Sequence, residues 1–93
     1  MVTAIVLINV ERGLVPEVGN RLSEMDGISE VYSVSGDFDL VALIRVASNE
    51  VLATLVTDSI AQVDGIEHTH TMLAFHVYSR HDLEAMFSIG ERP

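Results

Sequence analysis

The sequence predicts an α+β domain of the ferredoxin-like type, with the element order βαββαβ. In this fold a four-stranded antiparallel sheet carries two helices on one face, and here a short C-terminal helix is expected to follow. Three observations predict it. Runs rich in β-branched residues alternate with helical periodicity, the two halves of the chain repeat each other, and 93 residues leave room for one compact domain over positions 1–93.

The first half of the chain predicts a strand, a helix and a second strand. Residues 2–10 are rich in β-branched side chains and predict the first strand. Within residues 14–26 the apolar positions recur at helical spacing, and Pro16 suits the first turn of this helix. These apolar positions are Leu14, Val18, Leu22 and Met25. Residues 28–35 predict the second strand, and Gly19 inside the helix is expected to mark close packing.

The second half predicts a strand and a helix in the same order. Residues 39–46 predict the third strand, and the short turn at residues 36–38 joins it to the second, as is typical of an antiparallel hairpin. Ser48 and Asn49 are good helix caps. A second apolar stripe at helical spacing follows them, formed by Leu52, Val56, Ile60 and Val63.

The end of the chain predicts one more strand and a short helix. Residues 66–78 predict a long fourth strand. Ser79 and Asp82 then resemble a capping box at the start of a terminal helix. The apolar residues of that helix are Leu83, Met86 and Phe87.

An internal repeat supports this order of elements. Seven residues of the first half match seven identical or similar residues of the second at a constant offset. The pairs are Leu14 with Leu52, Val18 with Val56, Leu22 with Ile60, Met25 with Val63, Asp26 with Asp64, Gly27 with Gly65 and Ile28 with Ile66. Residues 6–10 likewise match residues 42–46. Each half therefore predicts one β-α-β unit, and two right-handed units interleave into a four-stranded antiparallel sheet with both helices on one face.

Both faces of this sheet are predicted to be apolar. A sheet that helices cover on one side only should alternate apolar and polar residues along each strand. In the first strand, however, Ile5 and Leu7 point away from the even-numbered apolar residues, and Val41 and Leu43 do the same in the third. Together with a hydrophobic content of 48%, this second apolar face predicts a homodimer that packs sheet against sheet.

Composition excludes several classes of partner and site. Five Lys and Arg against fourteen Asp and Glu give a formal net charge of -9, which repels nucleic-acid phosphates and anionic lipid surfaces. No direct nucleic-acid or membrane partner is therefore expected. The chain has no cysteine, which excludes disulfides, thiol nucleophiles and Cys-based zinc sites. The apolar run at residues 1–10 is too short for a membrane span and lacks a basic leader, so a cytoplasmic location is expected.

The hairpin between the second and third strands is the strongest candidate for a binding site. Its glycine permits close backbone approach, and two carboxylates flank it. Such a turn can bind a free amino acid, because backbone N–H groups face the ligand carboxylate while an aspartate faces its ammonium group. The candidate residues are Ser35, Gly36, Asp37 and Asp39. An ordinary polar turn is the alternative.

Three segments give the chain a specific resemblance: residues 31–40 (VYSVSGDFDL), residues 63–66 (VDGI) and the pair Thr69 and Thr71. With them, nearly the whole chain resembles the effector domain of the Lrp/AsnC family of feast/famine regulators. The resemblance implies an amino-acid pocket between neighbouring dimers, and a ring of dimers, often four, giving an octamer. It implies that the hairpin and polar residues of the fourth strand line this pocket, namely Gly36, Asp37, Asp39, Thr69 and Thr71.

The sequence departs from the family pattern at its start. The helix-turn-helix that the family carries before this domain is missing, so direct operator binding is not expected of this chain. It resembles the stand-alone members, which sense alone or join rings of full-length regulators. For Thr69 and Thr71 a second interpretation stays open, because threonines at alternate positions are also good strand formers.

Three histidines are predicted on the other face of the fourth strand: His68, His70 and His76. Two imidazoles at this spacing could hold a metal ion, although no third ligand is evident and no metal site is expected. The alternative is a set of exposed or interface histidines, which would make assembly sensitive to pH near 6 to 7.

Three functions stay open at this point. The first is a module that binds a small amino-acid-like effector without a cofactor. The second is a cofactor-free dimeric enzyme of the monooxygenase or isomerase type, with a histidine in an apolar cavity between sheet and helices. The third is a pure assembly partner of a full-length regulator. Because no Ser-His-Asp order, phosphate-binding glycine loop or HExxH signature is present, catalysis is not expected.

Overall fold

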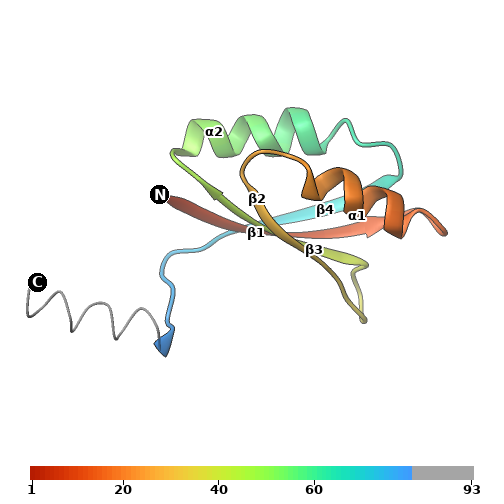
Figure 1. Ribbon diagram of the computed structural model, residues 1–93, viewed down its shortest axis with the longest axis horizontal. Helices are drawn as coiled ribbons and strands as arrows, with labels where there is room; N and C mark the ends of the chain where they lie inside the picture. Colours follow the sequence, from red (N-terminus) through yellow and green to blue (C-terminus); the bar gives the residue numbers. More distant parts are fainter. Residues whose placement is uncertain (81–93) are drawn as a thin grey trace, which may run out of the picture.

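The computed structural model describes residues 1–80, and its elements follow the predicted order (Figure 1). The strands form one antiparallel sheet in the order β2-β3-β1-β4. The ferredoxin-like prediction is therefore confirmed. The elements are β1 (Val2–Val10), α1 (Val15–Ser23), β2 (Ile28–Ser33), β3 (Leu40–Val46), α2 (Asn49–Thr54), its continuation η1 (Leu55–Ile60) and β4 (Ile66–Leu73). The predicted terminal helix lies outside the described residues.

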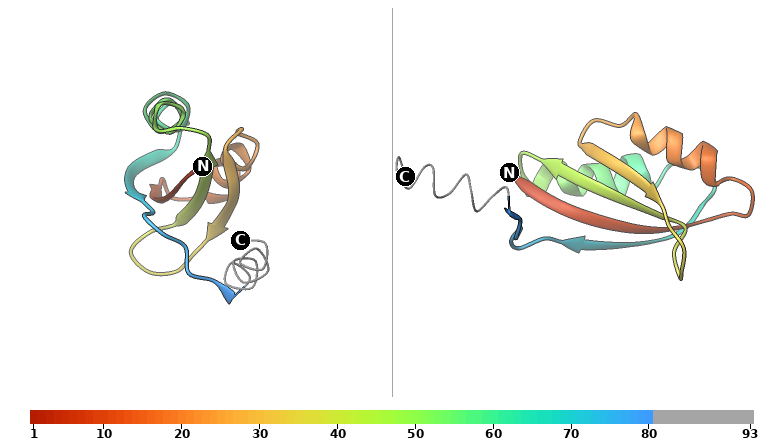
Figure 2. Two further views of the ribbon diagram at one scale, coloured as in Figure 1. Left: turned by 90° about the vertical axis from the view of Figure 1, so that its left-hand side faces the viewer. Right: turned by 60° about the horizontal axis from the view of Figure 1, so that its bottom comes forward.

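The hydrophobic core lies between the sheet and the helices, which sit on the same side of it (Figure 2). The two central strands supply alternate residues to this core, and the helices supply residues at helical spacing. The buried strand residues are Ala4, Val6, Ile8, Val10, Leu40, Ala42, Ile44 and Val46 on the central strands and Ile28 on β2, and the buried helical residues are Val18, Leu22, Leu55 and Ile60. No helix within residues 1–80 is both long and apolar enough to span a membrane.

The second helix begins as predicted but does not stay α-helical. The Val51 N–H donates to Ser48 Oγ at 3.2 Å, which confirms Ser48 as its N-cap. From Leu55 the helix widens into a π-helix. Just there the Thr57 hydroxyl donates to the Ala53 carbonyl at 2.6 Å. A hydroxyl that bonds back to the preceding turn competes with the backbone N–H groups and perturbs the helix locally.

The two glycines of the internal repeat occupy equivalent positions in the structure. Gly27 and Gly65 each precede a strand and have φ values of 96° and 98°, a region that side chains rarely adopt. A Cβ at Gly27 would lie 2.8 Å from Val46 Cγ1, and one at Gly65 would lie 2.9 Å from Leu14 Cδ1. In both halves the chain therefore turns from helix to strand directly against the core.

Several boundaries differ from the prediction, and the second helix ends at Ile60, before the predicted stripe residue Val63. β4 ends at Leu73 rather than at residue 78, because β1, the strand with which it pairs, begins at Val2. The last hydrogen bond between the two strands is donated by the Ala74 N–H to the Thr3 carbonyl at 2.9 Å. β2 ends at Ser33, so the hairpin loop covers residues 34–39. α1 covers only residues 15–23 of the predicted 14–26, because its end tightens: the Met25 N–H donates to the carbonyl three residues back, at 3.1 Å.

The prediction that Gly19 marks close packing between the helix and the sheet was wrong. A Cβ there would meet Leu40 Cδ2 at 3.7 Å, which is ordinary van der Waals contact. The helix does not need glycine at this position to approach the sheet.

Candidate functional site

The hairpin loop is fastened to the C-terminal end of β1 through Asp39. The Asp39 N–H donates to the Ile8 carbonyl at 2.9 Å, and its Oδ2 accepts from the Val10 N–H at 2.8 Å. The Val34 N–H closes the loop on the Asp39 carbonyl at 3.0 Å. One carboxylate oxygen of Asp39 therefore holds the loop in place, and Asp39 is half-buried while the tip of the loop is exposed.

The tip of the loop bends toward the side of the sheet that the helices leave open (Figure 2). Asn9, which points to this side, donates its side-chain N–H to the Asp37 carbonyl at 2.8 Å. Ser35, Gly36 and Asp37 are all exposed, and no atom lies within 4 Å of the position of a Gly36 Cβ. Sequence reasoning missed Asn9. Its signal was a polar side chain at the end of an otherwise apolar strand.

Thr69 and Thr71 lie on the opposite side of the sheet from the loop tip. Thr69 pairs with Ile8 and Thr71 with Val6, so both point toward the helix-covered side. Both are nevertheless exposed, because β4 is an edge strand and their part of it is not buried beneath a helix. The structure therefore brings the two threonines together, as predicted, but separates them from the loop tip.

The open face of the sheet carries a row of four cross-strand neighbours. Tyr32 on β2 pairs with Val41, Val41 with Leu7, and Leu7 with His70 on β4. A second row runs parallel to it through Glu30, Leu43, Ile5 and Met72. The four central side chains of the two rows are half-buried, whereas both outer strands are exposed here. The predicted second apolar face of the sheet is confirmed, and Tyr32, Glu30 and His70 place polar groups along its edges.

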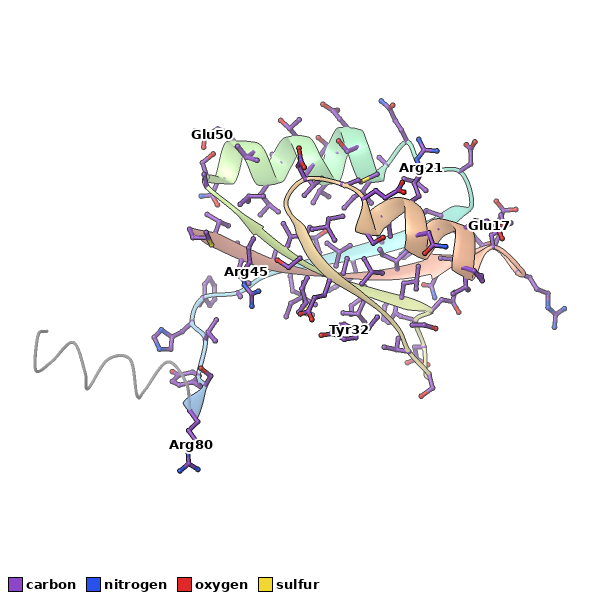
Figure 3. The ribbon with its side chains drawn as sticks, in the orientation of Figure 1. Glu17, Arg21, Tyr32, Arg45, Glu50 and Arg80 are labelled. Carbon is purple, nitrogen blue, oxygen red and sulfur yellow. The ribbon has the colours of Figure 1, made fainter. Side chains whose placement is uncertain are left out.

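Tyr32 and Glu30 form a hydrogen-bonded pair at one of these edges. The hydrogen bond to Glu30 raises the pKa of the Tyr32 phenol above its ordinary value, and desolvation and the Glu30 charge act in the same direction. The charge of Arg45 opposes this shift. Figure 3 shows Tyr32 and Arg45 on the side of the sheet away from the helices.

The model of the Lrp/AsnC ligand binding domain matches residues 3–83. The chain belongs to the Lrp/AsnC family. It is 36% identical over 77 residues to the HTH-type transcriptional regulator FL11 of Pyrococcus furiosus. The matched segment covers 83% of this chain and 50% of the regulator. The chain thus spans about half the length of the curated relatives it matches, which are named as transcriptional regulators.

Solved structures agree with the fold. TTHA0845 from Thermus thermophilus is 44% identical, with a TM-score of 0.81 over 86% of this chain and 100% of that one. PHS023 from Pyrococcus horikoshii is 31% identical, with a TM-score of 0.78 over 87% of this chain and 98% of that one. This Lrp/AsnC domain therefore has its predicted family as well as its predicted fold.

The histidines of this Lrp/AsnC domain do not share one strand face. His68 and His70 point to the open face of β4, but His76 follows the end of the strand and packs edge-on against Tyr78, with ring centroids 4.6 Å apart. The prediction of three aligned histidines was wrong because β4 stops at Leu73. Within residues 1–80 no three His, Cys, Asp or Glu side chains gather where they could hold a metal ion.

The arrangement expected for the enzyme alternative is likewise absent from the described residues. His70 points away from the helices, and His76 lies beyond the strand, so neither enters a space between sheet and helices. Hollows of about 340 and 330 Å³ lie beside α2 and between α1 and β2. Neither is lined by the loop tip, the two threonines or a histidine.

Proposed function

We propose that this Lrp/AsnC domain binds a small amino-acid-like ligand in a cleft between subunits and modulates transcription through its assembly. Assembly here means dimers that join into a ring, alone or together with full-length regulators. The observation that carries the proposal is the separation of the loop tip from Thr69 and Thr71. Both groups are exposed but lie on opposite sides of the sheet, so one small ligand can contact both only if two chains contribute.

The two groups offer complementary chemistry to an amino acid. Around Gly36 the exposed backbone can approach a ligand carboxylate closely, and the Asp37 carboxylate can face its ammonium group. Thr69 and Thr71 present two hydroxyls that can donate to or accept from either group. Asp39 supports the site from behind, because its hydrogen bond to Val10 fixes the loop on β1.

The same proposal includes a dimer through the open face. Its four central side chains are already half-buried, so covering each of them contributes only about 1 kcal/mol, or about 8 kcal/mol for two subunits. Association costs roughly 4 to 15 kcal/mol in lost freedom. Apolar burial alone therefore leaves the free energy of dimerisation near zero, and the polar groups at the edges of the face decide how stable the dimer is.

Isothermal titration against the twenty amino acids tests ligand binding. We expect one or a few of them to bind, and the variant T71V to weaken binding at least tenfold because it removes one ligand-facing hydroxyl. T57V is the matched control, since the Thr57 hydroxyl already donates to the Ala53 carbonyl within its helix. No heat from any amino acid at millimolar concentration would contradict the proposal, as would equal losses in T71V and T57V.

Light scattering of the variant L7D tests the dimer. Leu7 lies at the centre of the open face and outside the buried core, so a carboxylate there should give a folded monomer. V51D is the control, because Val51 is 48% exposed on α2, on the other side of the sheet. A wild-type chain that stays monomeric at micromolar concentration would refute this part of the proposal.

A further inference from the structure

Apart from Arg45, the ionisable groups of the open face lie at opposite edges of the sheet. β2 carries the carboxylate of Glu30 beside Tyr32, and β4 carries His68 and His70, while β1 has no ionisable side chain between them. Arg45 on β3 lies two residues beyond Leu43, toward the opposite end of the face from the hairpin. The acidic edge, on β2, and the basic edge, on β4, are separated by the apolar side chains of β3 and β1.

Two identical sheets can pack face to face about a two-fold axis in two simple ways. An axis along the strands reverses the strand order, so that β4 of one subunit lies over β2 of its partner. An axis across the strands instead places β4 over β4 and β2 over β2. The second arrangement opposes carboxylate to carboxylate and imidazole to imidazole, and like charges across an interface are unfavourable.

We propose that the axis runs along the strands, so that His70 of each subunit lies against the hydrogen-bonded Tyr32 and Glu30 of its partner. This inference rests on the sheet-to-sheet dimer proposed above and deepens it. Rotation about an axis along the strands leaves the position of each residue along the strand direction unchanged. The row from Tyr32 to His70 in one subunit therefore lies over the same row of its partner, in the reverse order. Packed sheets lie about 10 Å apart, which two side chains can bridge.

The remaining ionisable groups near this contact can be placed in the same way. His68 of the partner subunit falls beside the hairpin, which carries Asp37 and Asp39, so it also meets carboxylates. Arg45 falls over the row of Thr3, away from both histidines. Each histidine of β4 therefore gains an acidic neighbour from the partner subunit in this arrangement.

The contact makes the dimer stronger at low pH. A neighbouring carboxylate favours the protonated imidazole, so a histidine in this contact holds its proton more tightly in the dimer than in the monomer. The stabilisation is fully present below the ordinary imidazole range near pH 6.5 and is lost as the pH rises above it. If protonation of the histidine strengthens each contact tenfold, which corresponds to one pKa unit, the two contacts change the dissociation constant of the dimer about 100-fold.

Sedimentation equilibrium between pH 5.5 and 8 tests the contact. We expect the dimer dissociation constant of the wild-type chain to rise at least about tenfold over this range, and the profile of H70Q to be much flatter. H76Q is the control for general charge, because His76 lies beyond the strand. A flat wild-type profile, or equal profiles for H70Q and the wild-type chain, would overturn the inference while leaving the dimer standing. A chain that is monomeric at every pH would overturn both.

Cross-linking tests the axis independently of pH. The chain has no cysteine, so Y32C and H70C each introduce a single thiol at an exposed position. A short bismaleimide should join the two variants when they are mixed, and neither variant to itself. Efficient self-linking of H70C would place β4 over β4 and overturn the proposed axis. Circular dichroism of each variant verifies that the fold is retained.

Discussion

Replacing Gly27 by alanine should destabilise the domain more than the same change at Gly13. Both glycines have positive φ, 96° and 87°, so alanine at either position costs about 1 to 3 kcal/mol of backbone strain. Only at Gly27 would the new Cβ also collide with the core, at 2.8 Å from Val46 Cγ1 and 3.2 Å from Leu55 Cδ2. At Gly13 no atom lies within 4 Å.

The collision at Gly27 adds about 1 to 3 kcal/mol, the usual cost of overpacking a core. With a urea m-value of about 1 kcal/mol/M, the two variants should differ by roughly 1 to 3 M in their unfolding midpoints. Both are measured at one protein concentration, because the proposed dimer would unfold in a concentration-dependent way. Equal midpoints for G27A and G13A would show that the helix-to-strand turn has room for a side chain, and would refute the packing described for both halves of the repeat.

Three further substitutions test separate parts of the fold, each by chemical denaturation. G19A should stabilise the chain by about 0.5 to 1 kcal/mol, since alanine favours the helix and its Cβ meets only ordinary contact. D39A should cost about 1 to 2 kcal/mol and speed hydrogen exchange of the Val10 amide, whose acceptor it removes. S48A should cost about 1 kcal/mol through loss of the cap on the Val51 N–H, and S48D should recover most of it.

The fold could be predicted because its signals are local or repeated. The apolar stripe of each helix and the β-branched runs have different periods. The Asp-Gly pairs that precede β2 and β4 mark equivalent turns, now seen at Gly27 and Gly65. The second apolar face of the sheet was also predictable, because Ile5 and Leu7 interrupt the alternation expected of a one-sided sheet.

The features that escaped prediction depend on neighbours far away in the chain. β4 was expected to continue to residue 78, since its sequence stays β-favourable, but the strand it pairs with begins at Val2. The alignment of His76 with His68 and His70 failed for the same reason. Asp39 was predicted only as a ligand group, because its hydrogen bond to Val10 spans 29 residues and leaves no local pattern.

A site divided between two chains ties ligand binding to assembly. If the loop tip of one subunit and the threonines of another must close on the same ligand, the ligand binds only the assembled form and stabilises it by mass action. Ligand at a hundred times its dissociation constant then adds about 2.7 kcal/mol per site to the assembly. The reverse also holds, so apparent affinity falls when the protein is diluted below its assembly concentration. Titrations with amino acids therefore belong above that concentration, where every cleft is complete before ligand is added.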